Sequence, residues 1–280
     1  MYARGYTAAN DGNISVRLGG DSLLMTPKGV CKGFMTPDMM CVTDLDGRKL
    51  RGDRDPSSEM LMHLEVYRQR PDVQAVMHAH PPIATGFAVA GIPLNRAVLA
   101  EVLTTLGAIP IAEYATPSTS ELPEAVRKYI KAHDGMLLAN HGALTVGSDL
   151  FSAYYKMETI EHFANISLVA RLLGRENLIA REEVQRLQEL RGTYGIQAPA
   201  PICPDPSAPS EAGSSGTIAV GDAAACQVVD APLGGGLRLV PDSPDGLARP
   251  ASGGTGEEAE IRLTYRELSA LIEEAIRSLR

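Results

Sequence analysis

The chain has 280 residues, of which 44% are hydrophobic and 21% are charged, a balance typical of a globular protein with room for a sizeable core. Its formal net charge of -8 argues against general affinity for nucleic acid or anionic membranes, because these surfaces bind clustered Lys and Arg. The first residues lack the apolar run of a signal peptide and no later run is long enough to span a bilayer, so we expect a cytosolic protein.

Residues 1–196 are expected to form the folded domain, because short apolar runs alternate there with helical patterns and turn signals. The runs that predict strands are 14–18, 23–26, 40–44, 73–78, 136–139 and 143–146. Apolar residues at spacings of three and four predict helices at 58–69, 122–132, 150–173 and 182–190. We therefore expect this part of the chain to contain both strands and helices.

The composition changes at residue 197. Residues 197–260 are rich in Pro, Ala, Gly and Ser, which predicts a largely disordered linker. Residues 261–280 predict an amphipathic helix, with a capping box formed by Thr264 and Glu267. This helix either folds back onto the main domain or a neighbouring subunit, or docks its apolar face into a groove on a partner protein.

Two histidines, His78 and His80, stand one residue apart at the end of an apolar run that meets a double proline. If this run is a strand, its period of two places both imidazoles on one face, close enough to hold one metal ion. A catalytic zinc site with an open position needs a third ligand, and His141, at the end of another apolar run, is the candidate. The remaining histidines fit helix-surface or ordinary polar positions: His63, His133 and His162.

A carboxylate follows two serines at the predicted start of a helix. Ser57 or Ser58 is predicted as the N-cap, which places Glu59 in the first helical turn. Glu59 either compensates the helix dipole or takes part in chemistry. Free N–H groups at a helix start also form an anion site, and the turns at 12–13 and 26–29 can present further N–H groups to a phosphate. Such turns usually only connect strands.

Taken in order, the motifs GNISVR, TPKG, PSSE, HAHP and NHG resemble those of the class II aldolase and adducin-head family. The resemblance covers about residues 2–195. It implies a fold of the α/β class, a three-layer α/β/α sandwich around a mostly antiparallel sheet, followed here by a flexible C-terminal extension. It also implies a ring-like homotetramer with active sites between subunits.

The resemblance further implies a role for individual residues. His78, His80 and His141 would bind Zn²⁺, although three imidazoles also accept other divalent metals. Glu59 would be the acid/base, and Tyr194 would help to handle an aldehyde product. The phosphate of the substrate would be held by Gly12, Asn13, Gly29, Ser57 and Ser58. Lys28 is not part of the family pattern, but its place in TPKG suits it to meet the phosphate as well.

The implied activity is retro-aldol cleavage of a phosphorylated (deoxy)ketose, such as L-fuculose 1-phosphate, to dihydroxyacetone phosphate and lactaldehyde. Glutamate at position 59 favours cleavage over epimerisation, because the epimerases of this family carry aspartate there. A sugar-phosphate epimerase, dehydratase or decarboxylase on the same zinc site stays an alternative, as does a non-enzymatic adducin-like binding module, which the complete histidine set disfavours. Asn10, Lys28 and Ala97 depart from the aldolase pattern and leave the identity of the ketose open.

The two ends of the chain carry separate expectations. Family members have a helix before the segment that matches residues 2–6, so the start here is either truncated or carries a shortened helix. The C-terminal helix on its linker resembles the encapsulation peptides of bacterial microcompartments. Residues 261–280 are therefore predicted to bind shell or core proteins, which would place the enzyme inside such a compartment within the cytoplasm.

Overall fold

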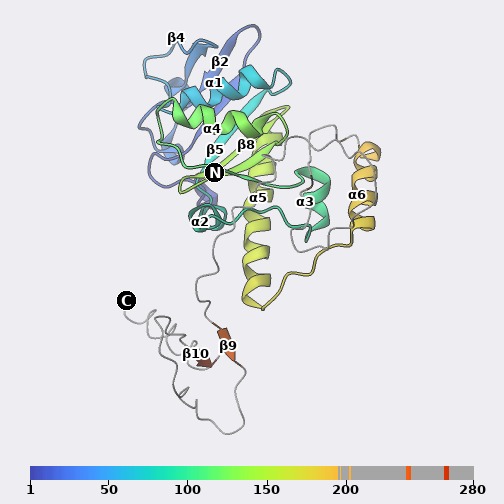
Figure 1. The fold of residues 1–280 in the computed structure, drawn as a ribbon. Coiled ribbons are helices and arrows are strands. Elements are labelled where there is room, and N and C mark those ends of the chain that lie inside the picture. Colours follow the sequence, from blue (N-terminus) through green and yellow to red (C-terminus); the bar gives the residue numbers. More distant parts are fainter. Residues whose placement is uncertain (195, 197–201, 203–237, 241–261, 265–280) are drawn as a thin grey trace. The chain divides into compact units, whose positions relative to one another are not determined.

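The computed structural model describes residues 1–194, 196, 202, 238–240 and 262–264 (Figure 1). The chain divides into two units, Met1–Val229 and Asp230–Arg280. Within the described residues of both units, no helix is long and apolar enough to cross a membrane.

The first unit is built on one eight-stranded sheet. Its strands in spatial order are β4 (Lys49–Arg51), β3 (Cys41–Asp44), β2 (Ser22–Met25), β1 (Asn13–Arg17), β5 (Ala75–Ala79), β8 (Gly142–Gly147), β7 (Gly135–Leu138) and β6 (Ile111–Ala112). Neighbouring strands run antiparallel except for β6 and β7. The expectation of a mostly antiparallel sheet is confirmed.

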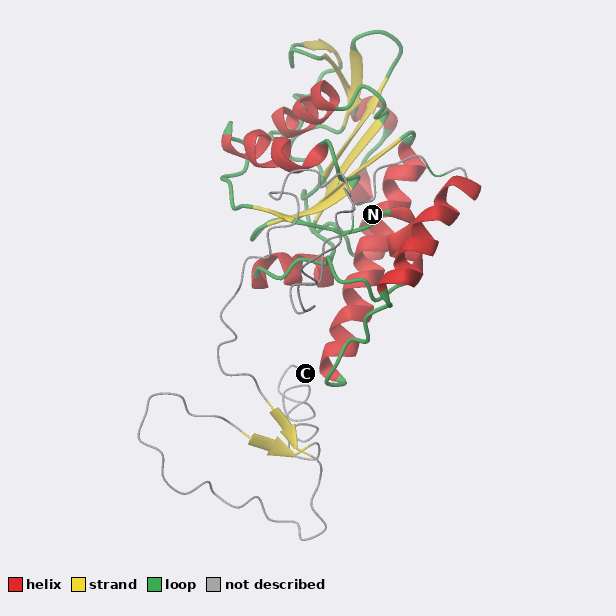
Figure 2. Cartoon of the chain, turned by 45° about the vertical axis from the view of Figure 1, so that its right-hand side comes forward, coloured by secondary structure: helices red, strands yellow, loops and turns green. Residues whose placement is uncertain are grey.

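Helices cover both faces of this sheet, as Figure 2 shows. The helices are α1 (Met60–Gln69), α2 (Pro82–Ala90), α3 (Ala100–Thr105), α4 (Glu121–Ile130), α5 (Leu150–Leu172) and α6 (Arg181–Thr193), with three short 3₁₀ helices at Tyr2–Arg4, Lys32–Phe34 and Pro37–Met39. Helices α1 and α4 pack on one face, and α2 and α5 pack on the other, so the three-layer architecture is confirmed.

Strand β5 shows how the sequence separates the two cores. Met77 belongs to the core on the α2–α5 side, whereas Val76 belongs to the core on the α1–α4 side. This alternation is the period of two expected for a strand. It directs His78 toward the face of the sheet that carries α1, where the candidate metal centre described below lies.

Two helices and two strands differ from the sequence-based expectation. The double proline, which we took as the end of the run, begins α2, because proline at the first helical position loses no hydrogen bond and already has a helical φ. Helix α3 was also not predicted. Strand β4 is exposed along its whole length and β6 has only two residues, so neither shows the alternation that predicts a strand.

In the second unit, β9 (Arg238–Val240) pairs in parallel with β10 (Arg262–Thr264). Residues 238–240 lie in the segment predicted to be disordered, and residues 262–264 form a strand where we placed the start of a helix. The rest of the predicted linker and helix lies outside the described residues.

Candidate metal centre

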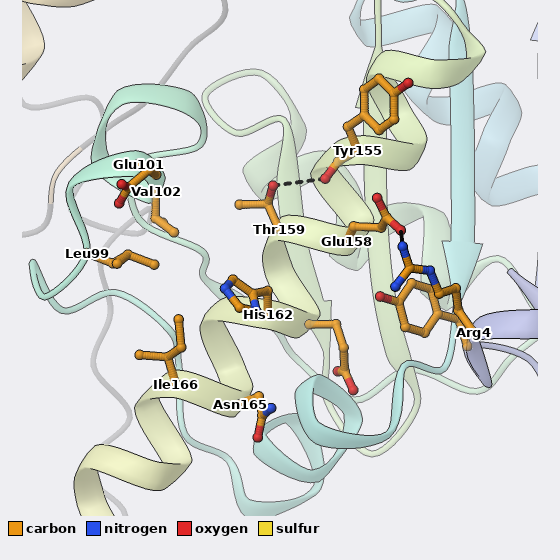
Figure 3. A pocket seen from close by; sticks show the side chains of 12 residues that line it. Arg4, Leu99, Glu101, Val102, Tyr155, Glu158, Thr159, His162, Asn165 and Ile166 are labelled. Carbon is orange, nitrogen blue, oxygen red and sulfur yellow. Dashed lines mark hydrogen bonds and ion pairs between the residues drawn. The ribbon is translucent and has the colours of Figure 1, made fainter.

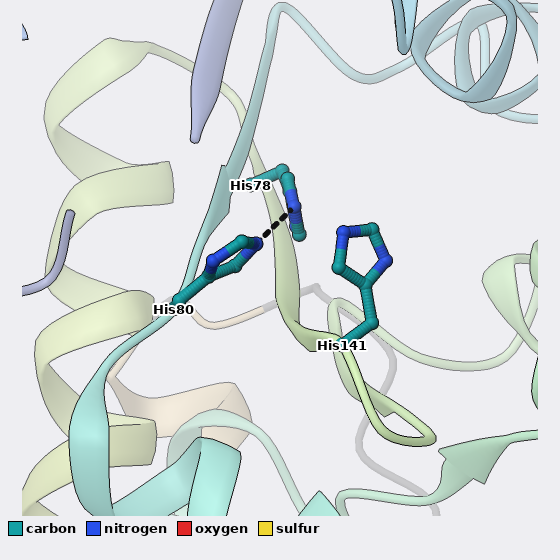
Figure 4. Close-up of side chains that lie close together, drawn as sticks. All are labelled: His78, His80 and His141. Atoms are coloured by element: carbon teal, nitrogen blue, oxygen red, sulfur yellow. Dashed lines mark hydrogen bonds between the residues drawn. The ribbon is translucent and has the colours of Figure 1, made fainter. Parts of the chain in front are cut away.

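Three imidazoles come together at one end of the central strands, as Figure 4 shows. His78, His80 and His141 each offer a ring nitrogen, and these nitrogens lie within 4.8 Å of one another. The Nε2 atoms of His78 and His80 are 3.1 Å apart. The prediction that the two histidines share a face, with His141 beside them, is therefore confirmed as geometry.

His141 owes its place to the turn that joins β7 and β8. Its N–H donates to the carbonyl of Leu138 at 3.0 Å, and Asn140 takes a left-handed backbone conformation with φ of 56°. Asparagine tolerates this conformation better than most residues. A Cβ at Gly142 would lie 2.5 Å from the carbonyl oxygen of Ala79 and 2.6 Å from the His80 ring. Only glycine lets the turn approach the other two ligands so closely.

The contacts behind the rings determine which nitrogens face the cluster. Nδ1 of His78 lies 2.9 Å from the carbonyl oxygen of Ala143, which can only accept, so Nδ1 carries the proton. Nδ1 of His80 lies 3.3 Å from a carboxylate oxygen of Asp11. Burial holds the pKa values of both rings below their usual range, so both are neutral at pH 7. Neutral imidazoles that present Nε2, with Nδ1 held from behind, form a donor set that fits a divalent metal ion.

Glu59 lies beside this donor set. Its Oε2 is 3.4 Å from Nε2 of His78, and its Oε1 is 3.2 Å from Nε2 of His141. Asn13 donates from Nδ2 to Oε2 at 2.7 Å. Burial pushes the pKa of Glu59 upward, but His141 and the amide of Asn13 outweigh burial and leave this pKa below its usual value. Oε1 is buried without a hydrogen-bond partner among the described residues, which suits a site that binds a cation.

Helix α1 starts later in the chain than predicted. The helix begins at Met60, so Glu59 occupies the N-cap position and not the first helical turn. The hydroxyl of Ser57 accepts from the N–H of Glu59 at 3.3 Å. Ser57 therefore caps the turn that carries Glu59 rather than the helix itself, while Ser58 is exposed.

The predicted phosphate residues lie on adjoining segments. Ser57 donates from its N–H to Thr26 at 3.2 Å, and Lys28 donates from its N–H to Asp55 at 2.9 Å. The expectation that the N–H of Ser57 is free for an anion is therefore wrong, because this N–H and that of Lys28 pair the loop before α1 with the loop after β2. The side chain of Lys28 is exposed.

Both glycines predicted at the phosphate site have the left-handed backbone that favours glycine. Gly12 has φ of 68° and Gly29 has φ of 71°. A Cβ on Gly12 would lie 2.9 Å from the carbonyl oxygen of His78, whereas nothing lies within 4 Å of a Cβ on Gly29. Gly12 thus brings its segment against the histidine strand, and Gly29 leaves open space.

Tyr194 is not brought into the cluster within this single chain. It lies just beyond α6, is 64% exposed, and makes no hydrogen bond, ion pair or ring contact with the three histidines among the described residues. A separate pocket, shown in Figure 3, is lined by α3, α5 and the N-terminal segment, and Arg4 pairs there with Glu158 at 2.9 Å. None of the predicted site residues lines that pocket.

The structure adds residues that sequence reasoning missed. Asp11 supports His80, and Lys32 donates from Nζ to the carbonyls of Asn10 and Val30 at 3.1 and 2.9 Å. His63 is fully buried behind Asn13. Its spacing of four residues from Glu59 on one helix is the only sequence signal that could have indicated this position.

The fold and the cluster together define an α/β/α protein of the class II aldolase type. Residues 1–168 match the family model described as the class II aldolase and adducin N-terminal domain. Since this match spans more than half of the chain, the chain belongs to that family.

Curated relatives match over most of their own length. An L-fuculose phosphate aldolase from Methanococcus maripaludis is 33% identical over 60% of this chain and 91% of the relative. A 5-methylthioribulose-1-phosphate/5-deoxyribulose-1-phosphate aldolase from Rhodospirillum rubrum is 32% identical over 71% and 90%. A 3-oxo-tetronate 4-phosphate decarboxylase from Pectobacterium atrosepticum is 31% identical over 60% and 79%.

Solved structures agree with this assignment. An L-fuculose 1-phosphate aldolase superposes with a TM-score of 0.62 at 33% identity, covering 66% of this chain and 87% of that one. The expectation of an enzyme of the lyase class is thereby confirmed, and it describes the chain better than the alternative of a non-enzymatic adducin-like binding module.

Proposed function

We propose that the chain is a zinc-dependent aldolase that cleaves a phosphorylated (deoxy)ketose, such as L-fuculose 1-phosphate, to dihydroxyacetone phosphate and lactaldehyde. One observation carries this proposal. The carboxylate of Glu59 lies within 3.4 Å of the Nε2 atoms of both His78 and His141, so a base stands at the edge of a three-imidazole cluster.

In this proposal His78, His80 and His141 hold the metal. Three imidazoles leave an open coordination position, which distinguishes catalytic from structural zinc sites. A bound zinc ion supplies a Lewis acid for the ketose carbonyl. The same three ligands accept other divalent metals, so metal analysis of the purified protein decides which ion is bound.

Glu59 transfers the proton that C3 gains in this reaction. When the bond between C3 and C4 of the ketose breaks, its electron pair stays with the ketone half, and the C4 hydroxyl loses its proton as the aldehyde forms. Returning a proton to C3 completes dihydroxyacetone phosphate. Glu59 is suited to this transfer because its Oε2 is fixed by Asn13, whereas Oε1 has no hydrogen-bond partner among the described residues.

The remaining roles are proposed from the arrangement of the loops. The phosphate would lie against the segments that meet at the Pro27–Pro56 bridge, which carry Lys28, Gly29, Ser57 and Ser58. Gly12 and Asn13, the other two predicted phosphate residues, stand on the segment that contacts Glu59 through Asn13. Tyr194 would act on the aldehyde product in the proposed homotetramer, with active sites between subunits.

A decarboxylase is the second candidate. It is favoured by the relative named 3-oxo-tetronate 4-phosphate decarboxylase, which is 31% identical to this chain. Both reactions break a carbon–carbon bond and leave an electron pair on a carbon beside a carbonyl, so one site suits either. The products separate them, since only decarboxylation releases carbon dioxide.

The deciding experiment measures dihydroxyacetone phosphate released from L-fuculose 1-phosphate by zinc-loaded protein, with and without chelator, and by the Glu59→Gln variant. Release that chelator and Glu59→Gln both abolish supports a metal aldolase with Glu59 in the chemistry. A zinc-loaded protein that releases none rejects this substrate. Rhamnulose 1-phosphate, pentulose phosphates and a 3-oxo-tetronate 4-phosphate are then tested for aldehyde and carbon dioxide.

The C-terminal segment is proposed separately to target the enzyme to a microcompartment. Residues 261–280, joined to the catalytic domain 1–196 by the linker 197–260, would bind shell or core proteins. Deleting 261–280 should leave activity unchanged and release the enzyme from purified shells. If the deletion instead breaks the oligomer, the targeting proposal fails.

A further inference from the structure

A fully buried histidine lies behind the proposed base. His63 is four residues after Glu59 on α1, and its ring reaches across to β1. Its Nε2 lies 2.5 Å from Oδ1 of Asn13, and its Nδ1 lies 2.6 Å from the hydroxyl of Ser15. Neither the metal cluster nor the proposed proton transfer uses this ring.

The hydrogen bonds of this ring run in one direction. Asn13 donates from Nδ2 to Glu59, so the amide atom that faces His63 is Oδ1, which can only accept. Nε2 of His63 therefore carries the proton, and Nδ1 accepts from the hydroxyl of Ser15. The Ser15 oxygen is then free to accept from the phenol of Tyr67 at 3.0 Å. Every donor in the series Tyr67, Ser15, His63 and Asn13 points toward Glu59.

Burial makes this series rigid. Asn13, Ser15, His63 and Tyr67 are each at most 3% exposed, so water does not compete for their hydrogen bonds. In such surroundings a hydrogen bond is electrostatically stronger, and each bond in a series polarises the next. Replacing the donor of His63 by an apolar group would leave Oδ1 of Asn13 buried without a partner, at a cost that favours rotation of the amide.

We propose that His63 is a positioning residue: through its Nε2–H it fixes the Asn13 amide, and the amide in turn holds Oε2 of Glu59 in the orientation that leaves Oε1 available for proton transfer. The catalytic consequence rests on the proposed function, whereas the orientation of the hydrogen bonds does not. His63 touches neither substrate nor metal in this scheme and acts only through Asn13.

Paired variants separate positioning from packing. His63→Gln keeps an N–H donor for Asn13 and an oxygen acceptor for Ser15, whereas His63→Leu fills similar volume with neither. We expect His63→Leu to lower kcat by about 10- to 100-fold while KM changes by less than about twofold, and His63→Gln to recover most of this loss. His133→Leu removes another fully buried histidine and should lower stability without changing kcat. Full kcat in His63→Leu, or equal losses in both His63 variants, would overturn the proposal.

A measurement on the unaltered protein needs no substrate. Nitrogen-15 NMR of the imidazoles, assigned by comparison with His63→Gln or by selective labelling, should show the His63 ring with its proton on Nε2, with and without zinc. A proton on Nδ1 would reverse the series and overturn the proposal. If Nε2–H is found but no sugar phosphate is cleaved, the proposed function fails while the hydrogen-bond assignment stands.

Discussion

Nδ1 of His80 lies 3.3 Å from the carboxylate of Asp11, a residue that precedes the first strand of the sheet. This contact fixes the ring so that Nε2 faces His78. Carboxylates in this position behind a histidine raise its basicity as a metal ligand. The N-terminal segment therefore contributes to the candidate metal centre although it supplies none of the three imidazoles.

Replacing Asp11 should weaken the metal site. We expect Asp11→Asn to lower zinc affinity by about tenfold, because a carboxylate behind a ligand commonly contributes an effect of this size and Asp11 is partly exposed. Competition with a chromogenic chelator measures the affinity. Asp46→Asn, in an exposed turn, is the matched control. Equal affinities in the two variants would show that the Asp11 contact contributes nothing.

Gly142 should not tolerate a side chain. A Cβ there meets the Ala79 carbonyl oxygen at 2.5 Å, and backbone cannot move aside cheaply, so we expect Gly142→Ala to lower the free energy of unfolding by about 1–3 kcal/mol. Zinc affinity should fall as well, since the His80 ring is displaced. Gly86→Ala, in α2 with nothing within 4 Å, should be neutral or stabilising. Urea unfolding measures the stability of both variants. If Gly142→Ala keeps full stability, even where Gly86→Ala loses some, the close approach at Gly142 is contradicted.

Lys32 should matter for binding more than for chemistry. Its ammonium is half-buried and joins the Asn10 and Val30 carbonyls, which flank the turns proposed to bind phosphate. We expect Lys32→Met to raise KM by about tenfold with little change in kcat, because a hydrogen bond to a charged group is lost at each loop. Lys131→Met, exposed and remote in sequence from both turns, should leave KM unchanged. A fall in kcat with KM constant would assign Lys32 to the reaction instead.

His63 should make stability depend on pH. Burial lowers its pKa to about 4 from an ordinary value of 6.5. Between these values the unfolded chain binds a proton that the folded protein does not, so stability falls as the pH falls, by about 2 kcal/mol at pH 5. His63→Gln lacks this titration, and its metal-free form should lose less stability between pH 7.5 and pH 5. Parallel urea-unfolding midpoints in both proteins would show that His63 is not the group responsible.

The histidine cluster was predictable because its first two members are fixed by a local rule. His78 and His80 share a face through the period of a strand, and this needs no knowledge of the rest of the chain. His141 joins them only because β7 and β8 form a tight turn at Asn140, which the pattern Asn-His-Gly indicates weakly. The position of Glu59 was close but shifted, since the helix begins one residue after it.

The supporting residues could not be found in the same way. Ser15, His63 and Tyr67 meet because α1 packs against β1, and no local pattern specifies which strand lies beneath a helix. The two-residue strand β6 is likewise created by its parallel partner β7 and not by its own sequence. Sequence patterns thus identified the three imidazoles of the candidate metal centre, whereas the groups that orient them depend on tertiary packing.

Asn13 and His78 are directly opposite each other on β1 and β5, two neighbouring strands near the middle of the sheet. A slip of this pairing by one residue would turn one of them to the far face, so the proposed metal ligand His78 and the residue that holds Glu59 could no longer meet. The metal can therefore serve as a sensor of folding: during refolding, high-affinity binding should appear only once the central strands have found their final register.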